Sequence, residues 1–430
     1  MASFDIREKL SIAAKILLLS ALAVPCTGLA QSAFEPFSKF EPLAKNESQQ
    51  QIVDEIRQEE AQQGSFSSAL IEPWTALALL YEEGGSRTLA IEAIEQARQV
   101  VRANYGLRSM KEAPLMRQEV HIDEARGDAE AAWGLEQNLL TRVSKNPRDL
   151  AGVPILREAG DERLDWLRRY RGGEVLPQIA LGCYYDKRLY HQSGIMFVSN
   201  GWGSGGCDAG DRDRVIGGLY AEAKLYYSEA IAVLVRNRRY SSDELRGLEA
   251  QLIRTSYASS DYLAGKKSYR RLIGYNAANS ASWLDRIETY VQMTDWDLLF
   301  SRHGSGTAVL DGIDEAYAQA YELLEGKAAE QSSIDEFFSP KIPIVLPSFL
   351  PNPLITKPSS DSNGYIDVAF DVTKYGEGEH VKILHAPANA PRAAKRDLVR
   401  LIRHSLFRPR VKNGKIADDS PVVVRYFLEH

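Results

Sequence analysis

The sequence predicts a mainly helical protein, an α-solenoid, that ends in a small α+β domain. Three observations lead to this fold class. Apolar residues recur at three- and four-residue spacing from about residue 46 to 335, which is typical of amphipathic helices. Six of the chain's 18 prolines then fall between residues 332 and 363, where they interrupt any regular element. After Gly364 the apolar period becomes two, which indicates strands.

Composition excludes several classes of protein. The chain has 430 residues, 44% hydrophobic and 26% charged, so it is neither disordered nor a multi-span membrane protein. Its formal net charge of −6 leaves no overall basic field, and we therefore expect no nucleic-acid partner. Three cysteines are too few for a disulfide-framed module or a multi-cysteine zinc protein.

The first thirty residues have the pattern of a secretory signal. Three basic residues precede an apolar run over 16–30, which is short for a membrane span of about 20 residues. The run ends in Gly-Leu-Ala, so we expect signal cleavage after Ala30 and export to a bacterial periplasm. Two alternatives stay open: an uncleaved anchor, and a lipoprotein on Cys26, although Pro25 does not fit a lipobox.

Export makes a disulfide the expected state of the two remaining cysteines. Cys183 and Cys207 are an even pair in an oxidising compartment. In the chain-entropy model, closing the loop between Cys183 and Cys207 stabilises the folded protein by about 3 kcal/mol. Two free buried thiols are the alternative.

The clearest helical pair spans residues 73–106, with a Gly-Gly-Ser turn at 84–86. Each helix places apolar residues on one face, and these are Trp74, Leu77, Ala78 and Tyr81 on the first helix and Ala90, Ile94 and Ala97 on the second. The pattern resembles the tetratricopeptide repeat, although Ile94 stands where an aromatic residue is usual and Arg102 where proline is usual. The resemblance implies two antiparallel helices that approach closely at their small residues.

The remaining helical region matches the repeat less well. We expect helices over 115–143 (with a turn at 125–128), 220–235, 241–257, 261–275, 282–300 and 314–324. Because only one unit matches well, the sequence predicts an irregular tetratricopeptide-like α-solenoid over residues 46–335. A plain helical bundle is the alternative.

Residues 336–363 are predicted to form a proline-rich strap and linker. Phe337, Ile344 and Phe349 stand among the prolines, so the segment is too apolar for a solvated tether. We expect an extended strap along the solenoid to about Ile355, followed by a flexible linker over 357–363.

The last domain, residues 364–430, is predicted to have the order β-β-α-β-β. The expected strands are 366–372, 381–384, 407–412 and 421–428, and the expected helix is 391–406. The last two strands are expected to pair as a hairpin across Asn413-Gly414. One helix would then cover one sheet.

This domain resembles the TonB C-terminal domain. The likeness is carried by the strand Gly364–Val372, by Phe407-Arg408-Pro409 after the helix, by Gly414 and by the strand Val422–Phe427. It implies a periplasmic domain that binds a short peptide of an outer-membrane receptor as an added strand. The long Pro-Glu/Pro-Lys spacer and the Tyr-Pro-x-x-Ala stretch of energy-transducing members are absent from the sequence, which puts energy transduction in doubt more than the fold.

The closing strand is expected at or near an edge of the sheet, because so small a sheet cannot close on itself. Its residues divide between two faces: Val422, Val424, Tyr426 and Leu428 toward the helix, and the predicted partner-binding residues Val423, Arg425 and Phe427 outwards. Cover by the strap, or pairing with a second copy of the domain as a homodimer, is the alternative.

Residues 392–415 carry nine basic residues and one acidic residue. Arg403, Arg408 and Arg410 are further candidate partner contacts in this segment. They would meet an acidic peptide, an anionic envelope polymer or the protein's own acidic helical region. A solvated helix face is the alternative.

No catalytic, metal or cofactor motif is visible, since Gly-x-Ser-x-Gly and His-Glu-x-x-His are absent and the glycine-rich segment 201–206 lacks a phosphate-binding lysine. We therefore expect no enzyme, no metal and no cofactor. The sequence predicts a periplasmic interaction scaffold, with a helical surface for one protein and a TonB-like domain for a peptide or another envelope partner, and with no membrane span in the mature chain. The main alternative is a TonB-type energy transducer anchored by residues 16–30.

Overall fold

The computed structural model describes residues 47–176, 212–239, 243–278, 282–300, 306–323, 334–354, 364–412, 415–417 and 419–428. The predicted cleavage site at Ala30, the cysteines Cys183 and Cys207 and the linker over 357–363 lie outside these ranges. The chain divides into two compact units, Met1–Leu139 and Leu140–His430. Among the described helices, none combines the length and the hydropathy needed to cross a bilayer.

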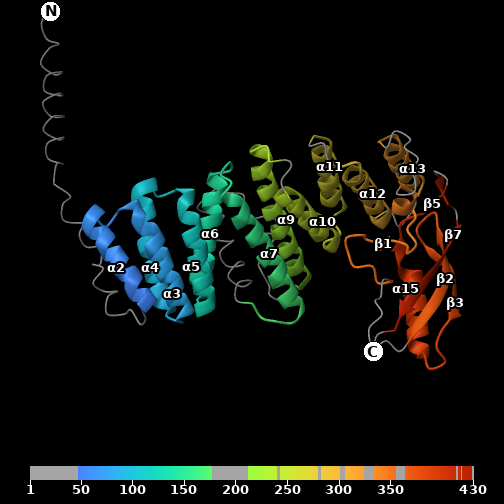
Figure 1. Cartoon of the computed structure of the whole chain (residues 1–430), viewed down its shortest axis with the longest axis horizontal. Coiled ribbons are helices and arrows are strands. Elements are labelled where there is room, and N and C mark those ends of the chain that lie inside the picture. The colour runs from blue at the N-terminus through green and yellow to red at the C-terminus, as the bar shows by residue number, and fades with distance from the viewer. Residues whose placement is uncertain are drawn as a thin grey trace, which may run out of the picture. The chain divides into compact units, whose positions relative to one another are not determined.

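The first unit consists of helices, and its first four α-helices contact their neighbours along the chain (Figure 1). They are α2 (Glu47–Gln63), the 3-10 turn η3 (Ser68–Leu70), α3 (Ile71–Glu83), α4 (Arg87–Tyr105), the 3-10 turn η4 (Met110–Glu112), α5 (Ala113–Arg126) and the first part of α6 (Ala129–Lys145).

Helices α3 and α4 form the hairpin that the sequence predicts. All seven residues of the expected apolar faces are buried, and they belong to one core cluster. In the turn between the helices Gly85 has a φ of 72°, a left-handed conformation that glycine adopts without steric cost. The three- and four-residue spacing therefore identified the faces of this hairpin correctly.

A buried charge network joins α4 to the next helix of the first unit. Arg98 Nε donates to Glu112 Oε1 over 2.9 Å, and the guanidinium of Arg98 also binds the Glu119 carboxylate. Arg102 Nη2 lies 2.6 Å from the same Glu112 oxygen. Arg102 therefore holds a buried carboxylate at the position where the repeat pattern usually has proline.

The helices of the second unit also pack in chain order. They are α7 (Gly152–Arg171), α9 (Arg212–Arg236), α10 (Asp243–Ala258), α11 (Tyr262–Ala278), α12 (Trp283–Phe300) and α13 (Gly306–Leu323). Helix α7 is not among the helices that the sequence predicts, and α9 and α13 begin earlier than the predicted helices 220–235 and 314–324. Gly217-Gly218 and Gly312 lie in the missed parts of α9 and α13, and glycine disfavours a helix locally although tertiary contacts can override it.

Two glycines allow close helix contacts in the second unit. At Gly160 on α7 a Cβ atom would lie 2.7 Å from the ring of Tyr227 on α9. At Gly265 on α11 a Cβ atom would overlap the indole of Trp296 on α12. Trp296 is itself fixed, because its Nε1 donates to the carbonyl of Tyr262 over 3.0 Å. Any residue larger than glycine at either position would therefore overlap an aromatic ring.

The C-terminal module has a three-stranded antiparallel sheet in the order β3-β2-β7 (Figure 1). Its strands are β2 (Tyr365–Thr373), β3 (Gly378–His385) and β7 (Asp419–Phe427), and its helix is α15 (Arg392–His404). The apolar residues of β2 and β7 join Leu398, Ile402 and Phe407 in one core. One helix thus covers one face of the sheet, as predicted.

The predicted hairpin between residues 407–412 and 421–428 is wrong. Residues 411–412 (β5, Val411–Lys412) pair instead with β6 (Lys415–Ile416) in a two-residue hairpin, and β7 pairs with β2 over nine residues. The Asn413-Gly414 signal therefore marked only the small hairpin. The long partner of β7 lies at the start of the module.

The strap contacts both the helices and the sheet module. Residues 334–338 form a helical turn, and β1 (Val345–Leu346) pairs antiparallel with β4 (Leu406–Phe407). On the helical side the ring of Phe338 lies 5.0 Å from that of Tyr317, and the ring of Phe349 lies 5.7 Å from that of Tyr257. The module and the last helices consequently share one compact unit.

A buried ion pair also joins the module to α12. Arg408, which follows β4, donates from Nη2 to Asp295 Oδ2 over 2.7 Å and from Nε to Oδ1 over 3.1 Å. Asp295 is 2% exposed and Arg408 is 4% exposed. Burial raises the pKa of the Asp295 carboxyl, and the guanidinium of Arg408 acts in the opposite direction.

Candidate functional site

The candidate site is the outer edge of β7, which ends the three-stranded sheet. β7 pairs with β2 on one side, and among the described residues no strand pairs with its other side. The burial of its residues alternates: Val422 and Val424 are buried, whereas Val423 is 59% exposed and Arg425 is exposed. The strand therefore presents one apolar face to the core and one face outwards.

The backbone register shows which groups of β7 point away from β2. The N–H of Leu428 donates to the carbonyl of Gly364 over 3.1 Å, so this residue pair exchanges hydrogen bonds. Because such pairs alternate along an antiparallel ladder, the N–H and C=O groups of Val423 and Arg425 point away from β2, toward the outer edge. Pro421 occupies the same class of position, where its missing N–H costs no ladder bond.

The opposite edge, β3, is less suited to accept another strand. Its register with β2 shifts twice, between Asp367 and Val368 and between Ala369 and Asp371, whereas the register of β7 is continuous. Charged side chains, among them Glu379 and Lys382, are exposed along β3. Bulges and edge charges are devices that prevent strand addition, so β7 is the more open edge.

The outer face beside this edge holds a group of stacked and paired side chains. Arg425 donates from Nε to Asp367 Oδ1 over 2.9 Å and from Nη2 to Asp367 Oδ2 over 3.0 Å. Its guanidinium also lies 3.9 Å from the centre of the Tyr365 ring. The hydrogen bonds from Arg425 lower the pKa of the Asp367 carboxyl. Arg425 is thus held flat against the sheet.

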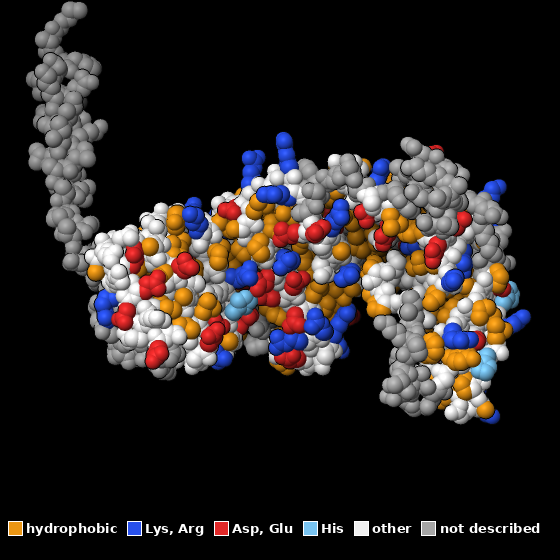
Figure 2. Space-filling model, viewed as in Figure 1, with side chains coloured by type: hydrophobic (Ala, Val, Ile, Leu, Met, Phe, Trp, Pro, Cys, Tyr) orange, Lys and Arg blue, Asp and Glu red, His pale blue; other side chains and the backbone are white. Residues whose placement is uncertain are grey.

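Apolar side chains surround this pair on the outer face. The ring of Tyr365 lies 6.3 Å from that of Phe427 and 5.0 Å from that of His385. Figure 2 shows hydrophobic, charged and histidine side chains mingled over the region of β2 and β3. A peptide strand added to β7 would find its backbone partners at the edge and apolar contacts at Val423 and Phe427.

The three basic candidates of the segment 392–415 have different surroundings. Arg403 is exposed on α15. Arg408 is buried against Asp295, so its expected role as a contact for an external partner is corrected: the pair satisfies its charge inside the protein. Arg410 is half-buried and donates from Nη2 to the carbonyl of Ser339 over 2.9 Å, and burial lowers the pKa of its guanidinium.

The residues that position Arg425 are not among the predicted site residues. Tyr365 and Asp367 belong to the opening strand, and their contact with Arg425 depends on the pairing of β2 with β7. The signal was present as alternation in both strands, with Asp367 and Arg425 each on the outer face. Alternation within each strand does not predict that Asp367 and Arg425 meet, because this contact requires the pairing of β2 with β7.

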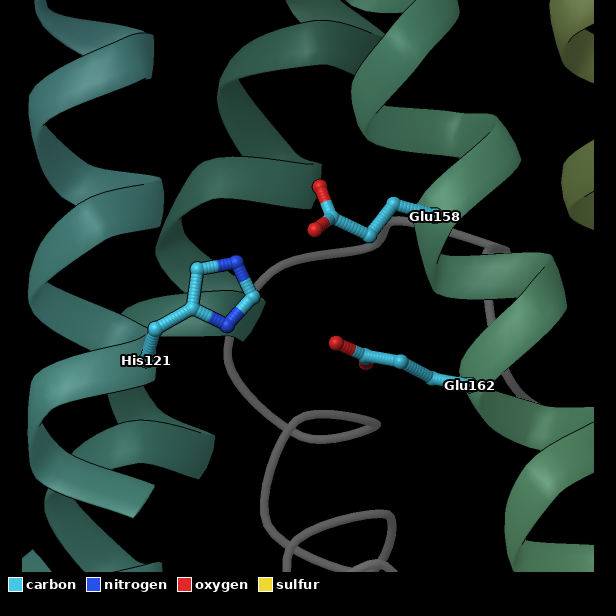
Figure 3. A group of neighbouring side chains, drawn as sticks. All are labelled: His121, Glu158 and Glu162. Carbon is cyan, nitrogen blue, oxygen red and sulfur yellow. The ribbon is translucent and has the colours of Figure 1, made fainter. Parts of the chain in front are cut away.

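Figure 3 shows His121 on α5 and Glu158 and Glu162 on α7. In the first unit, His121 Nδ1 lies 3.9 Å from Glu124 Oε2, one turn further along α5. In the second unit, Glu158 and Glu162 occupy consecutive turns of α7. Neither arrangement forms a nucleophile–base pair.

Comparison with protein families and with curated proteins finds no match for this chain. Solved structures that resemble it include BtubC (BKLC) from P. vanneervenii, with a TM-score of 0.32 and 13% identity over 76% of this chain and 98% of that one. A putative kinesin light chain from Podosopora anserina, with nearly identical TPR-like repeats, has a TM-score of 0.27 and 14% identity over 62% and 96% of the two chains.

The C-terminal part of a TPR repeat-containing protein from Cytophaga hutchinsonii has a TM-score of 0.25 and 12% identity over 70% of this chain and 98% of that one. Likenesses at this level do not assign a fold by themselves. The description of this chain as mainly helical, with a small C-terminal sheet, depends on its own helix and strand contacts.

Proposed function

We propose that the protein is a non-enzymatic interaction scaffold of the bacterial cell envelope. In this proposal the helical hairpins bind one protein partner, and the C-terminal module binds a peptide as an additional strand at β7. The observation that carries the proposal is the regular outer edge of β7, where the backbone N–H and C=O groups of Val423 and Arg425 point away from β2. Backbone hydrogen bonds would supply affinity and the outer-face side chains would supply selectivity.

The module's likeness to the TonB C-terminal domain supports strand addition as the binding mode. The contacts of the module with α12 support a scaffold rather than an energy transducer. A transducing domain at the end of a long spacer needs to move freely, whereas the Asp295–Arg408 pair and the pairing of β1 with β4 attach this module to the helices. An outer-membrane receptor peptide or another envelope protein is the proposed partner.

The periplasmic location rests on the N-terminal sequence. We expect the exported protein to begin at Gln31, because the apolar run ends there in small residues. Edman sequencing of protein purified from a periplasmic extract measures this directly. An intact N-terminus in the membrane fraction would instead support the anchored alternative.

We expect Val423→Pro to abolish peptide capture while the module stays folded. The substitution removes an N–H that points to the open edge, and proline is tolerated at such edge positions. Val423→Thr is the matched control, because it keeps the N–H and the β-branched shape. Val424→Pro should unfold the module, since its N–H belongs to the ladder with β2.

Peptide capture is measured in cells with a photo-crosslinking amino acid in place of Phe427. Wild type and Val423→Thr should give the same adducts by mass spectrometry, and Val423→Pro should give none. Circular dichroism and hydrogen exchange of β2 establish that the proline variant is folded. A folded Val423→Pro protein with unchanged adducts would show that strand addition at β7 is wrong.

A further inference from the structure

The exposed side of α15 carries a row of arginines that the proposed function does not use. We propose that this row, Arg392, Arg396, Arg400 and Arg403, binds a carboxylate-rich segment of a partner protein. Helix α15 covers one face of the sheet, whereas Val423 and Phe427 belong to the other face. The module would therefore hold two partners on opposite sides, and this inference does not depend on strand addition at β7.

The arginine row is a geometric consequence of how α15 packs. Leu398 and Ile402 face the core, which leaves the four arginines exposed on the opposite side of the helix. They follow one another at intervals of four, four and three residues, so they span about 16 Å along the axis at a rise of ~1.5 Å per residue.

Three of the four arginines of this row have no carboxylate partner within the described part of the chain, and the fourth has an exposed one. The one acidic residue of α15 is Asp397, whose Oδ1 lies 3.7 Å from Arg396 Nε in an exposed pair. For Arg392, Arg400 and Arg403 no carboxylate lies within ion-pair distance among the described residues. Unlike Arg408, which Asp295 neutralises, these guanidiniums remain available to a partner.

The helix dipole acts differently on the two ends of the row: Arg403 lies in the last turn, where a cation is favourable, whereas Arg392 lies in the first turn. The first turn of α15 contains Arg392 and no acidic residue, and its N-cap residue Pro391 makes no side-chain hydrogen bond. Cations at this end oppose the helix dipole, whereas an anion would be stabilised there. Bound carboxylates would relieve this repulsion, so the arrangement favours an anionic partner.

The other exposed side chains of α15 favour a protein partner over a membrane or a nucleic acid. They are Ala393, Asp397 and His404, and none is a large apolar or aromatic residue that could enter a bilayer or stack on bases. All four cations are arginines, whose planar guanidinium binds carboxylates through two parallel hydrogen bonds. The two four-residue intervals correspond to about 6 Å each, close to the two-residue repeat of an extended chain, roughly 6.6 Å, and the last interval is about 4.5 Å.

The test is binding of a fluorescein-labelled peptide with alternating Asp and Ser to the full chain, measured by fluorescence anisotropy at two salt concentrations. A variant with all four arginines of the row replaced by Gln should bind about tenfold more weakly or worse, because it loses four charge pairs. The matched control carries the same charge change at exposed positions elsewhere: R108Q, R148Q, R254Q and R270Q. It should bind like wild type.

Three further measurements decide the nature of the contact. Replacing the four arginines by Lys should give intermediate affinity, because charge is kept and the paired hydrogen bonds are lost. The double variant R392Q/R396Q should weaken binding severalfold. It replaces the quadruple variant as the test if the quadruple variant does not fold. Unchanged peptide affinity in folded variants would overturn the proposal. So would tighter, row-dependent binding of phosphatidylglycerol vesicles or of a single-stranded oligonucleotide.

Discussion

Replacing Asp295 with Ala will destabilise the second unit by about 3–5 kcal/mol, the cost typical of breaking a buried ion pair. The loss has two parts. Arg408 would remain buried without a carboxylate, and the joint between α12 and the segment after β4 would lose its hydrogen bonds. Because both groups are almost fully buried, solvent cannot replace the missing partner.

Two variants give this result its controls. Asp297→Ala removes a carboxylate two residues further along α12 that pairs with Lys266 in a partly exposed position, and it should cost at most about 1 kcal/mol. The double variant Asp295→Leu/Arg408→Met should recover most of the loss, because an apolar pair avoids the desolvation of both charges. Urea titration read by hydrogen exchange of peptides from α12 and residues 406–412 measures all three variants. A loss near 1 kcal/mol for Asp295→Ala would contradict the buried pair.

Replacing Gly265 with Ala will destabilise the second unit by about 3 kcal/mol, near the upper end for overpacking of a core. The added Cβ would lie 2.6 Å from Cε2 of Trp296 and closer still to two other ring carbons. The ring has little freedom to move, because its Nε1 donates to the carbonyl of Tyr262 and the rings of Tyr269 and Phe300 lie 5.9 and 4.7 Å from it between ring centres.

Gly274, in the same helix, is the matched control. A Cβ there meets no atom within 4 Å, so Gly274→Ala should stabilise the protein by about 0.5–1 kcal/mol through the helix propensity of alanine. Opposite signs for the two variants are the expected result in urea unfolding monitored by tryptophan fluorescence. A stabilising Gly265→Ala would mean that α11 and α12 do not approach so closely.

The C-terminal module shows how far periodicity alone predicts a binding edge. Alternation over 422–428 predicted which side chains of β7 face the core, and Val423 and Arg425 are exposed accordingly. It did not predict the partner of β7, because the Asn413-Gly414 turn suggested a local hairpin. The pairing with β2 joins residues 58 positions apart, and only this pairing brings Asp367 to Arg425.

By itself, the sequence determined the helical character of the described parts of residues 47–323, the faces of the α3–α4 hairpin and the alternation of the last strand. These are local properties, since each follows from residues within one or two turns or along one strand. The tertiary structure alone decided that Arg408 is neutralised by Asp295, 113 residues away, and that the row on α15 is left exposed. In the sequence, the basic residues of 392–415 form one run and cannot be told apart. In the folded chain some are buried and others exposed, because the fold determines which guanidinium meets a carboxylate.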